Sequence, residues 1–415
     1  MRLDRLHVLA AVSIVALAAT LAATAATAAE GDDMARKSDT RAAGPWNLKE
    51  LAKPPKVYPA PGFAEKGVRA IFYEGLPWKG NPTRVFAWYG LPQRKAGEKV
   101  PAMVLVHGGG GTAFAEWVRL WTSRGYAAIS MDTCGCTAGG MHGLRPRHNA
   151  GGPPGWGGYD QIDLPAEDQW MYHAVADGIL ATSLLASMPE VDADRIGITG
   201  ISWGGILACT VAGLDSRLKF AAPVYGCGFL GNDPRSLNPQ IADAAKRKKW
   251  LDLWDPSVYL PGARLPMLWV TGTNDFAFPL PNLQKSYRLP PGERTLAVRV
   301  AMAHGQEQGA APEEIALLAD RLLKGGPAPA RITGQGANGA GAWATFKADR
   351  PVAKAELNYT CDKGAWKERK WKTVPADLDT AAGKVNAALP DGVTVYYFNL
   401  VDGAGRVVST EHVER

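Results

Sequence analysis

The chain of 415 residues has few cysteines, and they follow no pattern typical of a metal site. Five is an odd number, so at least one thiol stays unpaired or bridges two chains. One residue separates Cys134 from Cys136, whereas zinc sites use CxxC pairs that recur along the chain. We therefore assign no metal, and we expect a structural role for this pair, with Cys227 as a candidate disulfide partner.

Long runs of one charge are also lacking. The net charge of +6 is modest for this length, and Lys and Arg are scattered apart from a short run at 246–249. A solvated helix face explains that run better than a nucleic-acid site does. With 46% hydrophobic residues and both charge signs mixed, the composition is that of a globular protein. We expect no nucleic-acid partner.

Apolar runs long enough to enter a membrane are absent beyond the first thirty residues. Arg2 and Arg5 precede an apolar stretch at 8–23, and small residues follow at 26–29. This order is typical of a secretory signal peptide, which we predict at 1–29. An uncleaved membrane anchor is the alternative, but the run is short for a bilayer span. We expect an exported protein, periplasmic or extracellular, with no stable membrane insertion after cleavage.

Strand-like and helix-like segments alternate over 63–324, after an N-terminal arm or linker at 30–62. Runs that are apolar throughout indicate strands buried on both faces of a parallel sheet, and alternation with helices predicts a doubly wound, mostly parallel α/β sheet. An antiparallel pair at 69–73 and 84–88 should open it. The expected later strands are 102–106, 126–131, 195–198, 220–225, 267–270 and 296–300, and the expected helices are 114–123, 166–186, 205–214 and 312–323.

The composition changes after residue 324. The Gly- and Pro-rich stretch 325–330 predicts a linker. Alternating patterns then recur at 342–346, 354–359 and 393–398, separated by turn signals. We predict a small C-terminal β-sandwich domain, immunoglobulin-like, over 331–415.

Two insertions interrupt the α/β rhythm, at 134–164 and 228–262. Both follow strands at their carboxyl ends, where ligands bind in open α/β sheets, and long loops of this kind are often functional. We interpret them as walls of a substrate pocket, with Trp156 and Trp254 as candidate lining residues. Surface decoration is the alternative.

The sequence Gly200-Ile201-Ser202-Trp203-Gly204 matches the GxSxG motif. It follows an expected strand and precedes an expected helix, which is the context that a nucleophile elbow requires. Ser202 must stand on a tight, strained turn, and Gly200 and Gly204 remove side chains that would collide there. The backbone N–H of Trp203 is then free to face a developing oxyanion. We predict Ser202 as a nucleophile, against the alternative of an ordinary turn serine.

A second glycine-rich motif, His107-Gly-Gly-Gly-Gly111, directly follows the expected strand 102–106. Glycines there let the backbone approach a substrate and present N–H groups, so Gly109 or Gly110 should complete the oxyanion hole with Trp203. We expect His107 to order this loop. A plain glycine-rich turn is the alternative.

A serine hydroxyl needs a base, and histidine is the usual one. His304 follows the last expected strand and precedes the last helix, the expected place in the chain order Ser, acid, His. Asp275 follows its own strand between Ser202 and His304, so we predict it as the acid that orients the imidazole. Asp252 and Asp255 are rivals in the polar insertion, and we expect Asn274 to be a turn residue.

Over about 65–324 these motifs resemble the α/β-hydrolase branch that includes acetyl xylan esterases, dienelactone hydrolases and prolyl-oligopeptidase-like enzymes. The resemblance implies a serine hydrolase whose catalytic residues are Ser202, Asp275 and His304. Prolyl oligopeptidases usually carry a large N-terminal propeller, whereas only some sixty residues precede the hydrolase part here, so we expect a peptidase less than an esterase. Dienelactone hydrolases of this group often use a cysteine nucleophile, and Ser202 favours ordinary esters instead. The residues that carry the match are 107–111, 192–196, 200–205, 272–275, Pro279 and 304–305.

The resemblance thus favours a carboxylic ester hydrolase that forms an acyl-enzyme, acting on a carbohydrate ester or a similar small molecule. Such chemistry needs no cofactor. An exported serine peptidase and a non-catalytic binding protein on a hydrolase scaffold are the alternatives. The motifs leave the oligomeric state open.

Overall fold

The computed structural model describes residues 44–232 and 240–415. The chain divides into the units Met1–Gly44 and Pro45–Arg415, and the description concerns the second unit. The predicted signal peptide and the arm up to residue 43 lie outside the described residues. Among the helices of the described ranges, none is both long enough and apolar enough to span a bilayer.

The sheet opens with antiparallel strands, as expected. β1 (Val57–Pro59) pairs with β2 (Arg69–Trp78), and β2 pairs with β3 (Asn81–Gly90). Tyr73 faces Val85 across the β2–β3 ladder, so the predicted pair 69–73 and 84–88 is confirmed. β3 then continues antiparallel to β5 (Ala127–Met131).

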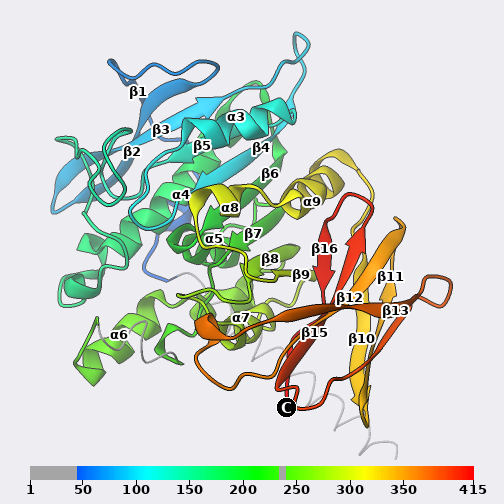
Figure 1. Ribbon diagram of the computed structural model, residues 1–415. Helices are drawn as coiled ribbons and strands as arrows, with labels where there is room; N and C mark the ends of the chain where they lie inside the picture. Colours follow the sequence, from blue (N-terminus) through cyan, green and yellow to red (C-terminus); the bar gives the residue numbers. More distant parts are fainter. Residues whose placement is uncertain (1–43, 233–239) are drawn as a thin grey trace, which may run out of the picture. The chain divides into compact units, whose positions relative to one another are not determined.

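Six parallel strands follow in the spatial order β5-β4-β6-β7-β8-β9 (Figure 1). The chain passes from β4 to β5 on one side and later returns to β6 on the other side of β4. A crevice forms at such a switch point, outside the carboxyl ends of the strands. The bounds are β4 (Val100–Val106), β6 (Val191–Ile201), β7 (Phe220–Val224), β8 (Met267–Gly272) and β9 (Arg294–Arg299).

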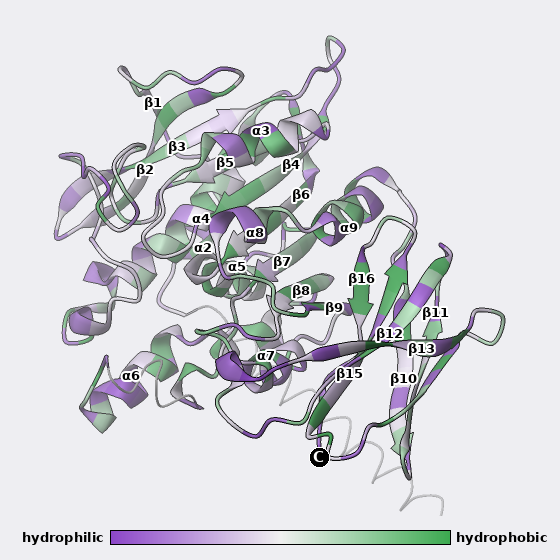
Figure 2. Ribbon diagram, viewed as in Figure 1, coloured by the Kyte–Doolittle hydropathy of each residue, from purple (hydrophilic) through white to green (hydrophobic). Residues whose placement is uncertain are grey.

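Helices cover this sheet where the sequence predicts them. α5 (Trp203–Leu214) is apolar nearly all round because it packs between the sheet and α4 (Trp170–Ser187). In Figure 2 the central strands are hydrophobic, whereas α6 (Ala244–Trp254) is more hydrophilic. The other helices of the α/β part are α2 (Leu48–Leu51), α3 (Ala115–Ser123), α7 (Leu280–Tyr287), α8 (Gln306–Ala310) and α9 (Glu313–Lys324).

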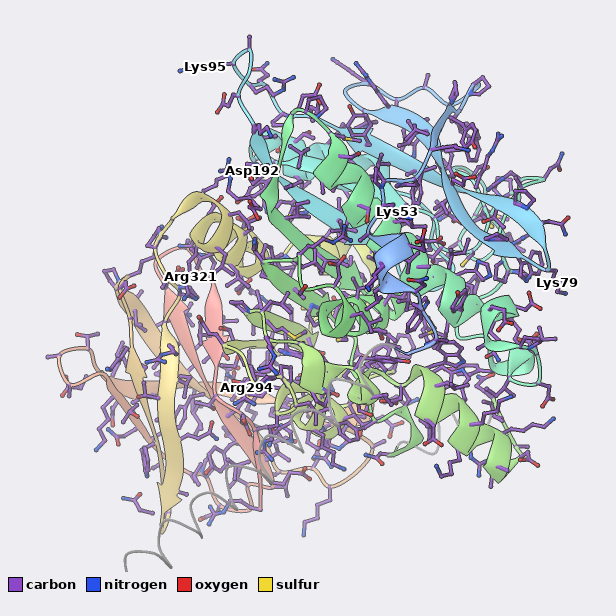
Figure 3. The ribbon with its side chains drawn as sticks, turned by 180° about the vertical axis from the view of Figure 1, so that it is seen from behind. Lys53, Lys79, Lys95, Asp192, Arg294 and Arg321 are labelled. Carbon is purple, nitrogen blue, oxygen red and sulfur yellow. The ribbon has the colours of Figure 1, made fainter. Side chains whose placement is uncertain are left out.

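α9 closes the α/β part. Gly325 ends it in the left-handed conformation with φ of 72°, which is the usual glycine C-cap. Arg321, labelled on this helix in Figure 3, donates to Glu293 directly before β9 (Nη2–Oε2 2.8 Å). The pair fixes the last helix against the strand that leads to His304.

Strands of the C-terminal part form where alternation predicts them, and they bury an apolar cluster of their own that includes Leu357, Val385 and Phe398. β12 pairs antiparallel with β13 and β15, and β11 with β10 and β14. An immunoglobulin-like sandwich, and the domain bounds 325–330 and 331–415, stay predictions. The strands are β10 (Arg331–Asn338), β11 (Gly341–Lys347), β12 (Val352–Thr360), β13 (Lys372–Asp379), β14 (Lys384–Ala388), β15 (Val395–Asp402), β16 (Val407–Ser409) and β17 (Val413–Glu414).

The ladder of the α/β sheet continues into these strands. Ser409 on β16 faces Leu296 on β9 in antiparallel register, and the Ser409 hydroxyl accepts the N–H of Val298 at 2.8 Å. Asn399 Nδ2 donates to the carbonyl of the same Val298 at 3.1 Å. The outer edge of β9 is therefore paired at Leu296 and Val298.

Candidate active site

Ser202 occupies the tight turn between β6 and α5. Its φ of 59° and ψ of −118° lie in a region that non-glycine residues rarely adopt. The turn is held because the Ser202 N–H donates to the carbonyl of Val224, at the end of the neighbouring strand β7 (2.8 Å). The strained turn leaves the serine side chain at the carboxyl edge of the sheet, on the wall of a cleft.

The glycines of the motif are required by close backbone contacts. A Cβ atom on Gly200 would lie 2.0 Å from the carbonyl oxygen of Gly204, and one on Gly204 would lie 2.0 Å from that of Val106. Real Cβ atoms do not approach so closely, so the collisions that the sequence predicted are present at both positions.

Ser202 and His304 line the same cleft, whose volume is about 760 Å³. The cleft lies beyond the carboxyl ends of β4 and β6, at the switch point of the sheet. Its walls include six aromatic side chains and few polar ones. The aromatic residues are Phe114, Trp156, Tyr159, Trp203, Phe276 and Phe278.

The predicted acid and base are hydrogen-bonded. His304 Nδ1 lies 2.7 Å from Oδ2 of Asp275, whose side chain is completely buried. The other carboxylate oxygen accepts the N–H groups of Ala277 (2.9 Å) and Phe278 (2.7 Å). Because a carboxylate only accepts, Nδ1 of His304 is the donor of this bond, and in the neutral ring Nε2 is then the acceptor.

Aromatic rings fix the His304 imidazole. Tyr225 stacks on it with ring centroids 4.5 Å apart. Phe276 packs against it at a tilt, with ring centroids 4.7 Å apart. The Tyr225 hydroxyl donates to the carbonyl of Ala303 at 2.6 Å. Burial raises the pKa of Tyr225, so this donor stays protonated. No pattern in the sequence indicates either ring, because their contact with His304 exists only in the fold.

Two backbone donors belong to residues that line the same cleft as Ser202. Trp203 is the first residue of α5, where an N–H has no partner within the helix. In the described ranges neither the N–H of Trp203 nor that of Gly109 donates to a protein acceptor, and both residues line the cleft. Gly110 is turned toward His142, whose ring would lie 2.4 Å from a Cβ there, so the geometry favours Gly109 over Gly110.

His107 orders the glycine loop, as expected from its position. Its Nε2 accepts the N–H of Thr133 at 3.0 Å, so its Nδ1 carries the proton and donates to the carbonyl of Gly108 at 2.7 Å. Burial lowers the pKa of His107, which keeps the ring neutral. Both ring nitrogens are thus occupied in structural bonds.

The rival acids have other roles. The buried carboxylate of Asp255 accepts N–H groups of Phe229, Leu230 and Ser257, so it organises the second insertion. Asp252 forms a surface ion pair with Lys248 on α6.

Both insertions contribute to the cleft, but one predicted lining residue does not. Trp156 lines the cleft with 38% of its surface exposed. The prediction for Trp254 was wrong, because this residue is completely buried and its Nε1 donates to Gln169 at 2.8 Å. Tyr159 and Gln240 are wall residues that the sequence reasoning missed.

Two polar side chains near His304 and the glycine loop were also missed. Gln306 follows His304 by two residues, and its Nε2 is buried in the cleft wall with no acceptor among the described residues. His142 donates from Nε2 to the carbonyl of Gly109 at 3.0 Å. The position of Gln306 directly after the His304-Gly305 pair was the only available signal.

The cysteine expectation requires a correction. All five cysteines are free, so the expected disulfide with Cys227 does not form. Cys134 instead donates its thiol to the carbonyl of Gly155 at 2.8 Å, and burial raises its pKa. Within the described ranges, no group of three or more His, Cys, Asp or Glu side chains is placed to hold a metal ion.

Comparison with known proteins gives a family match over part of the chain, and a fold. Residues 64–248 match the family model of acetyl xylan esterase. An acetyl xylan esterase from Paenibacillus sp. R4 superimposes with a TM-score of 0.53 and 24% identity, over 67% of this chain and 92% of that one. Acetyl xylan esterase 1 from Thermoanaerobacterium gives a TM-score of 0.49 at 18% identity, over 68% of this chain and 94% of that one. An acylaminoacyl peptidase from Pyrococcus horikoshii gives a TM-score of 0.48 at 19% identity, over 63% of this chain and 42% of that one.

At such identities a structural likeness shows the fold, and here it shows a mixed α/β fold of the α/β-hydrolase kind with a large sheet. The match to the family model adds a similarity to the acetyl xylan esterases over 64–248. The resemblance inferred from the motifs is therefore confirmed: this chain is similar to the acetyl xylan esterases over 64–248 and has a fold of the α/β-hydrolase kind.

Proposed function

We propose that this protein hydrolyses carboxylic esters through an acyl-enzyme on Ser202, with His304 as base and Asp275 as its orienting acid. The observation that carries the proposal is the 2.7 Å bond between the buried Asp275 carboxylate and His304, on the same cleft as the strained Ser202 turn. A nucleophile, a base and an orienting acid in this order define the chemistry of acyl transfer.

In the first half-reaction, Ser202 Oγ attacks the ester carbonyl while His304 Nε2 accepts its proton. The imidazolium that forms is stabilised by Asp275, which is held by two backbone N–H groups. His304 then protonates the leaving alcohol as the tetrahedral intermediate collapses. A water molecule, deprotonated by His304, releases the acid from Ser202 in the second half-reaction.

The negative oxygen of each tetrahedral intermediate needs donors already in place. The free N–H groups of Trp203 and Gly109 beside Ser202 fit this role. Loss of one such donor costs about 3 kcal/mol of transition-state stabilisation.

We infer that the substrate is an acylated carbohydrate or a similar small ester. The family match over 64–248 supports an ester, and the cleft of about 760 Å³ has room for an alcohol larger than a methyl or ethyl group. Aromatic walls such as Trp156 and Phe276 offer flat apolar faces for a ring. We also propose that the segment 1–29 exports the protein and is removed.

A fluorophosphonate probe tests the nucleophile. We expect labelling of the wild-type protein, its loss in Ser202→Ala and its retention in Ser123→Ala, a control at the exposed end of α3. To test the substrate class, acetate release is measured with acetylated xylan, a carbohydrate ester, and with an aryl acetate, a simple ester. A folded protein that releases acetate from neither would refute the proposal, and faster cleavage of a short peptide amide would favour the peptidase alternative.

A further inference from the structure

Asn274, directly before Asp275, joins the loop that carries the acid to the C-terminal strands. Its Nδ2 donates to the carbonyl oxygens of Arg369 (2.7 Å) and Lys367 (3.2 Å). These acceptors belong to the short 3-10 helix η6 (Trp366–Glu368) and the residue after it. Carbonyl groups at a helix end have no partner within the helix, so they are available to a side chain from elsewhere. Asn274 is therefore more than the turn residue that the sequence indicated.

The oxygen of the same amide continues the connection toward the base. Asn274 Oδ1 accepts the hydroxyl of Thr273 at 2.7 Å, and this hydroxyl accepts the N–H of Ala301 at 3.0 Å. Ala301 lies three residues before His304 and has a φ of 52°, a strained value for alanine. One hydrogen-bonded chain thus links the C-terminal strands to the loops of both the acid and the base.

The far end of this chain is fixed in its own right. Arg369 places its guanidinium 3.8 Å from the centre of the Trp366 ring and donates from Nε to the carbonyl of Gly364 at 2.9 Å. Trp366 also makes an edge contact with His412, whose ring centre lies 5.4 Å from its own. The segment whose carbonyl groups Asn274 binds is therefore also held by contacts that do not involve Asn274.

We propose that Thr273 and Asn274 are positioning residues, through which the C-terminal strands hold Asp275 and His304 in the geometry for catalysis. The inference rests on the proposed ester hydrolysis. It assigns the C-terminal part a function in the reaction, although no residue of that part lines the cleft in the described ranges. A shift of about 1 Å in a catalytic group costs roughly a hundredfold in rate, so a loose acid loop slows the reaction without blocking substrate binding.

Two substitutions of Thr273 separate positioning from stability. Thr273→Val keeps the volume but removes the hydroxyl, and we expect kcat on an aryl acetate to fall about tenfold to a hundredfold with KM within about twofold. Thr273→Ser keeps the hydroxyl but removes a buried methyl group, so we expect a lower Tm with kcat within about threefold of the wild type. We thus expect the larger loss of kcat in Thr273→Val and the larger loss of Tm in Thr273→Ser.

Asn274→Ala tests the other link and serves if Thr273→Val does not fold, because Asn274 is only half-buried. We expect the same selective loss of kcat. The control is Glu411→Gln, which removes the ion pair between Arg288, directly after α7, and Glu411, another contact between the α/β part and the C-terminal part. It should leave kcat unchanged.

The inference is overturned if Thr273→Val and Asn274→Ala keep wild-type kcat, or if the loss of kcat follows Tm through all four variants. That result differs from failure of the proposed function. An inactive, folded wild-type protein, or labelling that survives in Ser202→Ala, would remove the proposed ester hydrolysis itself.

Discussion

The carboxylate of Asp275 binds the Nδ1 side of the His304 imidazole at 2.7 Å and takes two backbone N–H groups on its other oxygen. The asymmetry gives each oxygen a separate task. One oxygen sets the orientation of the carboxylate, and the other sets the tautomer of the base.

Asp275→Asn should therefore fold but lose activity. Its amide oxygen can keep the bonds to Ala277 and Phe278, which places the NH₂ group against His304 and favours the wrong tautomer. We expect kcat to fall about 10⁴-fold. Steady-state kinetics on an aryl acetate, with circular dichroism for the fold, check this prediction. Retention of kcat within tenfold would contradict the assigned role.

Trp156→Ala should weaken binding of bulky alcohols. The indole lines the cleft and lies against Gly109 of the glycine loop, so its removal takes away apolar contact with the substrate but no reacting group. We expect KM for an acetylated oligosaccharide to rise about tenfold, while labelling by a small fluorophosphonate keeps its rate. Met141→Ala, at an exposed residue of the same insertion that does not line the cleft, is the control. Equal KM values in both variants would exclude the contact.

Gly204→Ala should destabilise the whole protein. The added methyl group would lie 2.0 Å from the carbonyl of Val106, in a backbone that cannot yield without displacing β4. We expect a loss of about 3 kcal/mol or more in the free energy of unfolding. Gly364→Ala is the matched control, since a Cβ there meets no atom within 4 Å. Denaturant unfolding of both variants measures the difference, and equal stabilities would contradict the predicted clash.

Acid should destabilise the fold through His412. Burial, and then the charges of Arg288 and Arg369, lower the pKa of His412 from 6.5 to about 4. The unfolded chain therefore binds a proton more readily than the folded one, and stability falls as the pH falls from about 6.5 toward 4. Between pH 7 and pH 4.5 this residue should account for about 2 kcal/mol.

Unfolding in urea at several pH values checks this contribution. His412→Gln removes the titrating ring, so the pH dependence of its stability should be shallower than that of the wild type over the same range. Parallel curves for the two proteins would show that another group causes the acid sensitivity.

The sheet and the site were predictable to different degrees. Strands such as 102–106 are apolar throughout because both faces are covered, and this pattern survives in the sequence. The predicted order Ser202, Asp275, His304 led to a pair that the structure joins by a hydrogen bond, because Asp275 and His304 each follow their own strand. The fold then requires them to meet at one edge of the sheet.

What the sequence could not reveal depends on contacts between distant segments. Trp254 and Trp156 both lie in insertions and look alike in the sequence, yet one packs against Trp46 in the core and the other lines the cleft. Asn274 looked like a turn residue because its carbonyl partners lie more than 90 positions away. Gln306 and Phe276 reach the cleft only through the path of their loops.

The pairing of β16 with β9 has a consequence for truncated forms of this protein. A strand at the rim of a sheet exposes a row of unpaired N–H and carbonyl groups, which invite another chain to add on. In the intact protein Ser409 and Asn399 occupy those groups near Leu296 and Val298. Removal of residues 331–415 would uncover this rim, so the shortened chain should self-associate, and its solubility would depend on protein concentration.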